Sequence, residues 1–391
     1  MDIAGLKKTI VSFAESRRDD WTAIAKHLHC HPETGLQEHE SSAFLASTLE
    51  REGFSVDRGV AGMATAFKAV YGAGKPSIAI LAEMDALPGL GHACGHNIIA
   101  AAAVGAAITL RHVLIPTAAR IVVMGTPAEE QGVGKIEMVK AGCFADVDFA
   151  MMVHPSSKRQ VMKMYLGLAK IRFTFLGKAA HAAAHPDEGV NALDAVLQMF
   201  NGVNALRQQL RQDVRVHGII TDGGVAPNII PEKASCFFYV RAEDLQEVEA
   251  VKSRVIRCAE GAAVATGCRV DIQEDKRVLA PLNINKNFYR VYSDQLRYLQ
   301  LQEANAPIDR NRGSSDIGNV SQVVPTIHPH VPIGDGIHIH TAEFAEATVS
   351  EKGKEAVVEG ATAMALTAAE LVASPGLCQE IMKEFISSLS K

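Results

Sequence analysis

The chain has 391 residues, of which 48% are hydrophobic and 21% are charged. This length exceeds what one hydrophobic core usually serves, so we expect two domains. The net charge of −5 and the pI near 6.3 argue against nucleic acid or a membrane as a partner, because an anionic partner needs a basic surface. Seven scattered cysteines lack the dense spacing of a secreted, disulfide-stapled domain, which favours a reducing cytoplasm.

Helical and strand patterns alternate in the first part of the chain. The N-terminal segment has an amphipathic helix pattern without the apolar stretch of a signal peptide, and we expect no apolar run of membrane-spanning length. The elements expected next are a helix at 41–53, strands at 77–82, 120–124 and 147–153, and an Ala-rich helix at 98–110. Short apolar strands between helices indicate an α/β layer, in which ligands gather at the carboxyl ends of the strands.

From about Gly167 half-exposed strands alternate with amphipathic helices. The expected elements are strands at 171–177, 235–243 and 270–275, with helices at 189–210 and 245–266. We expect this α+β set to form a small sheet with helices on one face, inserted into the larger domain. The chain then returns to a last helix at 350–373.

Two clusters carry residue types that bind metals. GHACGHN, residues 91–97, places Cys94 and His96 two positions apart, beside glycines that allow a tight turn. Taken alone this pair is a weak metal signal, and a structural role is equally open. In TPAEEQGVGK, the adjacent side chains of Glu129 and Glu130 point in different directions, so one can bind metal while the other serves as general base. A solvated loop is the alternative for this second cluster.

Histidines and one arginine extend the set of candidates. His154 follows an apolar run, where a side chain can project into a cleft, although a core or edge histidine fits equally. His338 and His340 alternate along IGDGIHIHTAEF and share a face, so spacing does not choose between them. Arg241 ends an apolar strand, where a guanidinium suits either capture of a substrate carboxylate or a structural salt bridge.

Taken together, these motifs resemble the M20 metallopeptidase family, in its amidohydrolase branch. The matching segments follow the family's order along nearly the whole chain: HPETGLQEHESSAFLASTLEREGF, EMDALPG, GHACGHN, GTPAEE, VHP, GKAAHAAAHP, APNIIPEKA, GSSDIGN and HTAEF. Within this branch the chain resembles the β-alanyl-lysine dipeptidase-like proteins and the p-aminobenzoyl-glutamate hydrolase subunits. The resemblance implies a larger α/β catalytic domain, residues 1–166 and 277–391, and an inserted ferredoxin-like dimerisation and lid domain, residues 167–276.

The resemblance also implies a site for two divalent metal ions, zinc or manganese, with cobalt as a further candidate. The implied metal ligands are Cys94, His96, Glu130, His154 and His340, with Cys94 able to bridge the ions. Glu129 becomes the catalytic base. His181 would reach into the active site of a partner subunit in a homodimer, and Asn228 and Arg241 would bind the carboxylate of the released amino acid.

Two positions depart from the family pattern. Asn97 stands where much of the branch has Asp, which removes a negative charge near the metals and leaves the metal preference open. Ala180 stands where many members have Gly before the lid histidine. The resemblance implies no role for three further histidines, His185, His217 and His338.

The expected activity is metal-dependent hydrolysis of the amide bond of a small dipeptide or an N-acyl amino acid, by a metal-activated water with Glu129 as general base. The runner-up is a p-aminobenzoyl-glutamate or N-acyl amino-acid amidohydrolase with the same site. A non-catalytic binding protein on the same fold is the distant alternative. Structural zinc is disfavoured, because such sites usually close with four Cys-rich ligands.

Overall fold

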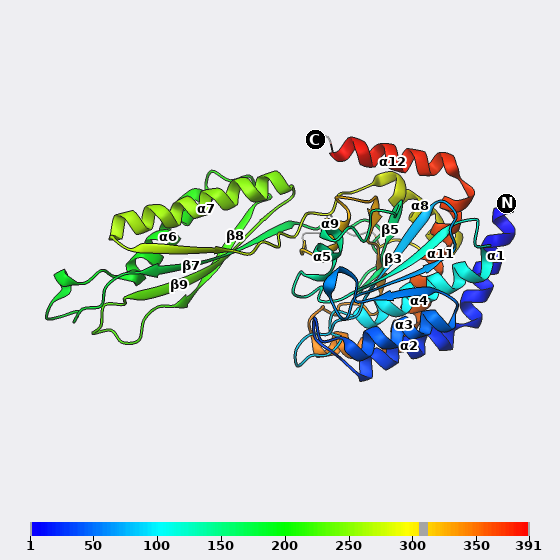
Figure 1. The fold of residues 1–391 in the computed structure, drawn as a ribbon, viewed down its shortest axis with the longest axis horizontal. Coiled ribbons are helices and arrows are strands. Elements are labelled where there is room, and N and C mark those ends of the chain that lie inside the picture. The colour runs from blue at the N-terminus through cyan, green and yellow to red at the C-terminus, as the bar shows by residue number, and fades with distance from the viewer. Residues whose placement is uncertain (1, 305–311, 390–391) are drawn as a thin grey trace. The chain divides into compact units, whose positions relative to one another are not determined.

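The computed structural model describes residues 2–304 and 312–389, which form two compact units (Figure 1). Unit 1 consists of Met1–Met164 and Leu282–Lys391, and unit 2 consists of Tyr165–Pro281. A smaller α+β unit is thus inserted into a larger α/β unit, and the predicted fold class is confirmed. Unit 2 encloses the segment 167–276 that we expected to be the inserted domain.

A six-stranded sheet forms the centre of unit 1. In spatial order its strands are β1 (Ser55–Arg58), β2 (Phe67–Tyr71), β4 (Arg120–Thr126), β3 (Ser77–Glu83), β5 (Phe149–Met151) and β11 (Thr326–Ile327). The last four run parallel, whereas β2 is antiparallel to both of its neighbours. Every residue of β3 is buried, as expected for a parallel strand covered on both faces. Glu83 pairs with Thr126, so the carboxyl ends of β3 and β4 lie side by side.

Helices cover this sheet. They are α1 (Ile3–Ser16), α2 (Arg18–Cys30), α3 (His39–Arg51), α4 (His96–Val113), α8 (Lys286–Tyr298), α11 (Glu351–Ala373) and α12 (Pro375–Leu389). The Ala-rich α4 packs against β3, and α11 packs along α4. Contrary to our expectation, α11 is long and apolar enough to cross a membrane, the one such helix among the described residues. Its most apolar window is 78% buried inside the structure, so α11 packs as a core helix.

Short elements connect these layers and carry candidate site residues. They are α5 (Gly134–Lys140), β6 (His154–Ser156), α9 (Ile317–Val320), β12 (His330–Pro332) and α10 (Ala342–Ala347). The run expected to be one strand at 147–153 is divided, because β5 ends at Met151 and His154 begins β6. β6 pairs in parallel with β12, outside the main sheet.

Unit 2 is an antiparallel four-stranded sheet with both of its long helices on one face (Figure 1). The strand order is β10 (Arg269–Glu274), β7 (Gly167–Leu176), β9 (Lys233–Ala242) and β8 (Arg215–Asp222), and the helices are α6 (Ala192–Arg207) and α7 (Leu245–Thr266). Phe173 and Phe238 pack in its separate core. β8 was not predicted, because its sequence RVHGIITD mixes exposed apolar and polar residues without alternation. It forms one edge of the sheet.

Candidate metal centre

Gly95 sets the turn that places the first two candidate ligands. It caps the N-terminus of α4 with φ +83°, a left-handed conformation that L side chains rarely adopt. A Cβ added there would lie 2.3 Å from Cγ of Pro155, so the loop also passes too close to β6 for any side chain. The glycine therefore lets Cys94 and His96 flank a sharp turn at the carboxyl end of the sheet.

Asp85, for which no role was predicted, orients His96. The Nδ1 atom of His96 lies 2.8 Å from the backbone oxygen of Asp85 and 3.0 Å from its Oδ1. Bonds of this kind fix the ring with Nε2 turned toward a metal. The other carboxylate oxygen of Asp85 accepts the backbone N–H of Glu130 at 3.0 Å. Burial alone would raise the pKa of Asp85, but the charge and hydrogen bond of His96 outweigh it and lower that pKa.

The two adjacent glutamates are separated by an unusual loop conformation. Ala128 has φ +54° although it is not glycine, and its backbone N–H donates to Oε1 of the buried Glu38 at 2.8 Å. From this turn Glu129 and Glu130 both approach His96 Nε2, at 3.9 Å and 4.0 Å. Glu38 is a second residue for which no role was predicted, although it lies within the first matching motif.

His154 faces the same space. Its Nδ1 lies 2.7 Å from the carbonyl oxygen of Pro155, and its Nε2 lies 3.6 Å from Sγ of Cys94. Burial, reinforced by the positive charge of His96, lowers the pKa of His154 to about 3. The ring is therefore neutral at pH 7, the form in which histidine binds metals.

The structure distinguishes the two histidines that spacing left open. His340 has φ +66°, and its backbone N–H donates to the carbonyl of Ala93 at 2.8 Å. This places its Nε2 3.5 Å from Oε1 of Glu130, and the interaction with this carboxylate raises the pKa of His340. His338 belongs to no metal-ligand group among the described residues.

The predicted ligands form overlapping groups whose ligand atoms lie within 4.8 Å of one another. The groups are Cys94, His96 and His154; Cys94, Glu130 and His340; and His96, Glu129 and Glu130. Cys94 belongs to two groups, as a thiolate between two ions would require.

The donor chemistry of these groups fits divalent metal ions. Thiolate, imidazole and carboxylate are the donors that zinc and its neighbours take in proteins. Two buried atoms that point into this space, His96 Nε2 and Glu130 Oε1, have no hydrogen-bond partner among the described residues. Burial raises the pKa of the Cys94 thiol, so the thiolate needs a cation beside it.

Three further charged residues lie directly against this group, and the sequence assigned a role to none of them. Glu83 ends β3 with Oε2 3.4 Å from His96 Nε2, Lys135 lies in α5, and Asp316 precedes α9. All three are at most 1% exposed. They occur within or near the matching motifs. No local pattern indicated that Lys135 and Asp316, 181 positions apart, would be in contact.

Comparison with known proteins decides the family. A peptidase dimerisation domain, that of the M20 peptidases, matches residues 166–266. The Xaa-Arg dipeptidase of Mus musculus is 36% identical to this chain, over 99% of the chain and 93% of its own length. The chain belongs to the M20 peptidase family. The sequence-based prediction of this family, and of a hydrolase acting on carbon–nitrogen bonds, is thereby confirmed.

Other M20-type proteins extend the likeness. A p-aminobenzoyl-glutamate hydrolase subunit of Escherichia coli (strain K12) is 39% identical over 67% of this chain and 59% of its own length. A dinuclear metal binding peptidase of the M20 family from Bacillus subtilis superimposes with a TM-score of 0.73 at 19% identity, over 92% of this chain and 99% of its own. The last comparison shows the shared fold.

The other candidates of this M20 chain lie in unit 2. The segments of His181 and Asn228 are adjacent, because the Ala182 N–H donates to the Asn228 carbonyl at 3.0 Å. Both side chains are exposed. The Nδ1 atom of His181 accepts the backbone N–H groups of Ala183 and Ala184 at 3.3 Å and 3.2 Å, so a neutral ring carries its proton on Nε2.

Arg241 lies near the end of β9. It is half-buried, with its guanidinium 5.9 Å from the centre of the Tyr239 ring. Burial lowers the pKa of Arg241, and Tyr239 opposes this effect. His217 faces Tyr239 from the neighbouring strand β8, with their ring centres 5.6 Å apart. His185 is exposed beside Glu188, at 4.0 Å.

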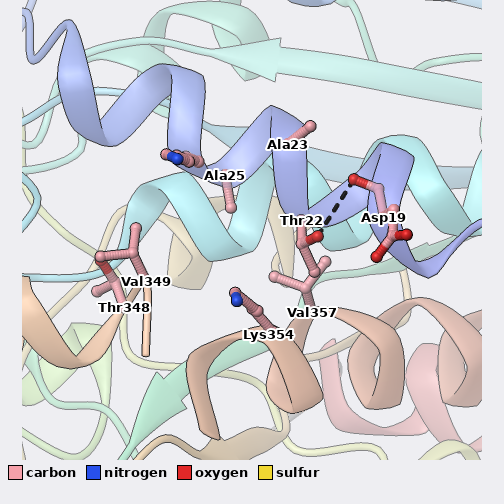
Figure 2. A pocket seen from close by; sticks show the side chains of 9 residues that line it. Asp19, Thr22, Ala23, Ala25, Thr348, Val349, Lys354 and Val357 are labelled. Atoms are coloured by element: carbon pink, nitrogen blue, oxygen red, sulfur yellow. Dashed lines mark hydrogen bonds between the residues drawn. The ribbon is translucent and has the colours of Figure 1, made fainter. Parts of the chain in front are cut away.

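Asn97 is directed toward the helices that surround the metal centre. Its Nδ2 donates to the Ala25 carbonyl and to the Thr348 hydroxyl, both at 3.1 Å, which joins α2 to the end of α10. A carboxylate could not donate these bonds. Ala25 and Thr348 also line a cavity of about 230 Å³ that holds none of the candidate ligands (Figure 2).

A separate group of metal-binding residue types lies on the surface of unit 1. His27 and His31 are one helical turn apart at the end of α2, with ring centres 4.5 Å apart, and Glu40 Oε1 lies 3.8 Å from His27 Nε2. His31 and Glu40 are exposed. Metal counts on this protein therefore need a variant that lacks this surface group.

Proposed function

We propose that this M20 peptidase is a dipeptidase that holds two divalent ions, zinc or manganese, at the candidate metal centre. The observation that carries the proposal is the convergence of five donors from separate segments around the space that Glu129 also faces. The ligands are Cys94, His96, Glu130, His154 and His340. The substrate is a small dipeptide, and the Xaa-Arg dipeptidase relative favours a basic C-terminal residue.

Glu129 is the general base in this account. When bound, the two ions supply positive charge that acidifies a water and polarises the scissile carbonyl. Glu129 is positioned by the Ala128 turn, accepts the proton of the attacking water at its carboxylate, and delivers it to the leaving nitrogen. Burial, followed by the nearby carboxylates of Glu83 and Asp316, raises the pKa of Glu129.

His181 of the partner subunit stabilises the negative charge that develops on the carbonyl oxygen. Its Nδ1 is used as an acceptor by backbone N–H groups, so its Nε2–H is the donor that faces outward. Asn228 and Arg241 bind the carboxylate of the C-terminal residue, for which a guanidinium offers two parallel hydrogen bonds. The position of Arg241 near the end of β9 supports this role.

A homodimer through unit 2 completes the site. The match to a peptidase dimerisation domain supports this assembly. β8 is an edge strand whose Ile219 is 63% exposed and Ile220 42% exposed. An apolar edge with unpaired backbone groups is suited to pairing with a second copy. The seven cysteines, all within the described residues, are free thiols, which supports a reducing cytoplasm as the location.

A second candidate function is hydrolysis of p-aminobenzoyl-glutamate or another N-acyl amino acid. The 39% identity to the p-aminobenzoyl-glutamate hydrolase subunit favours it. Both reactions use the same metal centre and base. They differ in the group joined to the released amino acid and, for the two named relatives, in the charge of that amino acid, which is basic in an Xaa-Arg dipeptide and acidic in p-aminobenzoyl-glutamate.

The test is a substrate panel with the purified protein, loaded with Mn²⁺ or Zn²⁺ or treated with a chelator. The panel contains Xaa-Arg, Xaa-Lys and β-alanyl dipeptides, N-acetyl amino acids and p-aminobenzoyl-glutamate, with products followed by mass spectrometry. We expect metal-dependent release of arginine or lysine from dipeptides. Release from acyl or aminobenzoyl conjugates alone would move the assignment to the second function, and turnover that survives chelation would contradict both.

A further inference from the structure

A fully buried ion cluster lies behind the metal centre. The ammonium Nζ of Lys135 is 2.7 Å from Oε1 of Glu83 and also contacts Oδ1 of Asp316. The backbone N–H of Lys135 donates to the other oxygen of Asp316 at 2.9 Å. The side chains of Lys135 and Asp316 are 0% exposed and that of Glu83 is 1% exposed. The cluster joins β3, α5 and the segment before α9.

Two carboxylates, those of Glu83 and Asp316, contact this ammonium, and the carboxylate of Glu129 lies beside them. Oxygens of Glu83, Glu129 and Asp316 lie within 4.8 Å of one another, a geometry that could itself hold a metal ion. Glu83 also lies 3.4 Å from the candidate metal-binding nitrogen of His96. Without a cation among them, like charges this close in a buried space would repel one another strongly. Among these three carboxylates, Glu129 is the proposed general base.

We propose that Lys135 is a positioning residue that acts on Glu129 through Glu83 and Asp316, and that its ammonium occupies the cation site that these two carboxylates form beside Glu129. The ammonium balances the negative charge of Glu83 and Asp316 next to the metal centre and excludes a third ion from this space. Glu129 then remains directed toward the water. This inference rests on the proposed function for its effect on turnover, but its effect on metal binding is independent of the substrate.

A purely structural ion pair would behave differently. Removal of one partner from a buried ion pair leaves the other charge unpaired and lowers the free energy of unfolding. If Lys135 were purely structural, Lys135→Met would lower stability but leave the turnover per folded molecule unchanged. If Lys135 is a positioning residue, that turnover falls, because Met leaves three carboxylates without a cation.

The experiment compares Lys135→Met, Lys135→Gln and Lys135→Ala with wild type in the metal-loaded protein. We expect kcat to fall by about 10²-fold or more in each variant, while KM changes by less than about threefold. Lys140→Met is the matched control, because Lys140 lies in the same helix but is exposed and pairs with Glu137. We expect Lys140→Met to keep wild-type kcat.

Two further readouts separate positioning from structure. Ethylammonium should restore part of the kcat of Lys135→Ala, whose cavity can admit it, but not that of Lys135→Met. Metal analysis should find about one more ion per chain in Lys135→Ala than in wild type. Both proteins are measured in a His31→Gln background, so that the surface group at the end of α2 adds nothing to the difference.

The outcomes separate this inference from the proposed function. Wild-type kcat in folded Lys135→Met, or lost kcat with neither amine rescue nor an extra ion, would overturn the positioning role. Failure of all three variants to fold, with Lys140→Met intact, would assign Lys135 to stability alone. If wild type hydrolyses nothing on the panel, the proposed function fails, whereas the extra ion in Lys135→Ala still tests the cation site.

Discussion

At Asp85 one buried carboxylate serves two parts of the candidate centre. One oxygen accepts His96 Nδ1 and the other accepts the Glu130 N–H, so a single side chain connects α4 to the loop of the base. The motif EMDALPG contains Asp85, but a sequence pattern cannot show which distant donors a carboxylate will meet. The candidate ligands could be proposed from the sequence, because each is a metal-binding residue type in a recognisable motif, and their assignment stays a prediction. The residues that orient these candidates could not be proposed.

Asp85→Asn tests this connection. The amide has one acceptor oxygen, so either His96 or the Glu130 N–H loses its partner. We expect metal affinity to weaken about 10- to 100-fold, as is typical for a residue that orients a ligand. Competition with a calibrated chelator measures the metal affinity. Asp148→Asn is the control, because Asp148 directly precedes β5 and its Oδ2 accepts the backbone N–H of Ser77 at the start of β3. An unchanged metal affinity in Asp85→Asn would show that Asp85 does not orient the candidate ligands.

At the scale of elements, buried strands and long amphipathic helices were predicted well, because burial leaves a strong pattern. The expected helix at 245–266 coincides with α7, and the expected strands at 77–82 and 120–124 lie within β3 and β4. β8 was missed, since an edge strand exposes apolar residues that no pattern marks as strand. The division between β5 and β6 was missed because the neighbouring strand, and not the local sequence, determines where pairing ends.

Gly95→Ala tests the turn between β3 and α4. The new Cβ would combine a left-handed φ with a 2.3 Å approach to Pro155. Gly142→Ala is a matched control, because Gly142 has φ +75° but nothing within 4 Å of an added Cβ. We expect both variants to lose about 1–2 kcal/mol for the backbone conformation, and Gly95→Ala to lose a further ~1–3 kcal/mol from the clash. If urea unfolding gave equal free energies of unfolding for Gly95→Ala and Gly142→Ala, the close contact between the added Cβ and Pro155 in β6 would cost no stability.

At the scale of the whole molecule, the account requires two chains for each active site. If His181 acts in the partner's site, then His181→Ala and Glu129→Gln are each inactive as homodimers. Mixing equal amounts should restore about a quarter of wild-type activity, because half of the dimers are hybrids with one intact site of two. Mass spectrometry of differently tagged chains confirms subunit exchange. Proven exchange without recovered activity would place His181 in its own chain's site or outside the reaction.

Glu129 is proposed to transfer the proton of the attacking water without being a metal ligand itself. The most direct measurement is turnover and metal content of Glu129→Gln on the best dipeptide of the panel, with Glu137→Gln, the same change at a partly exposed glutamate in α5, as the control. We expect kcat to fall by at least about 10²–10⁴-fold while bound metal stays at the wild-type level. Turnover near that of wild type would rule out Glu129 as the base, and so would a loss of activity that only follows a loss of metal.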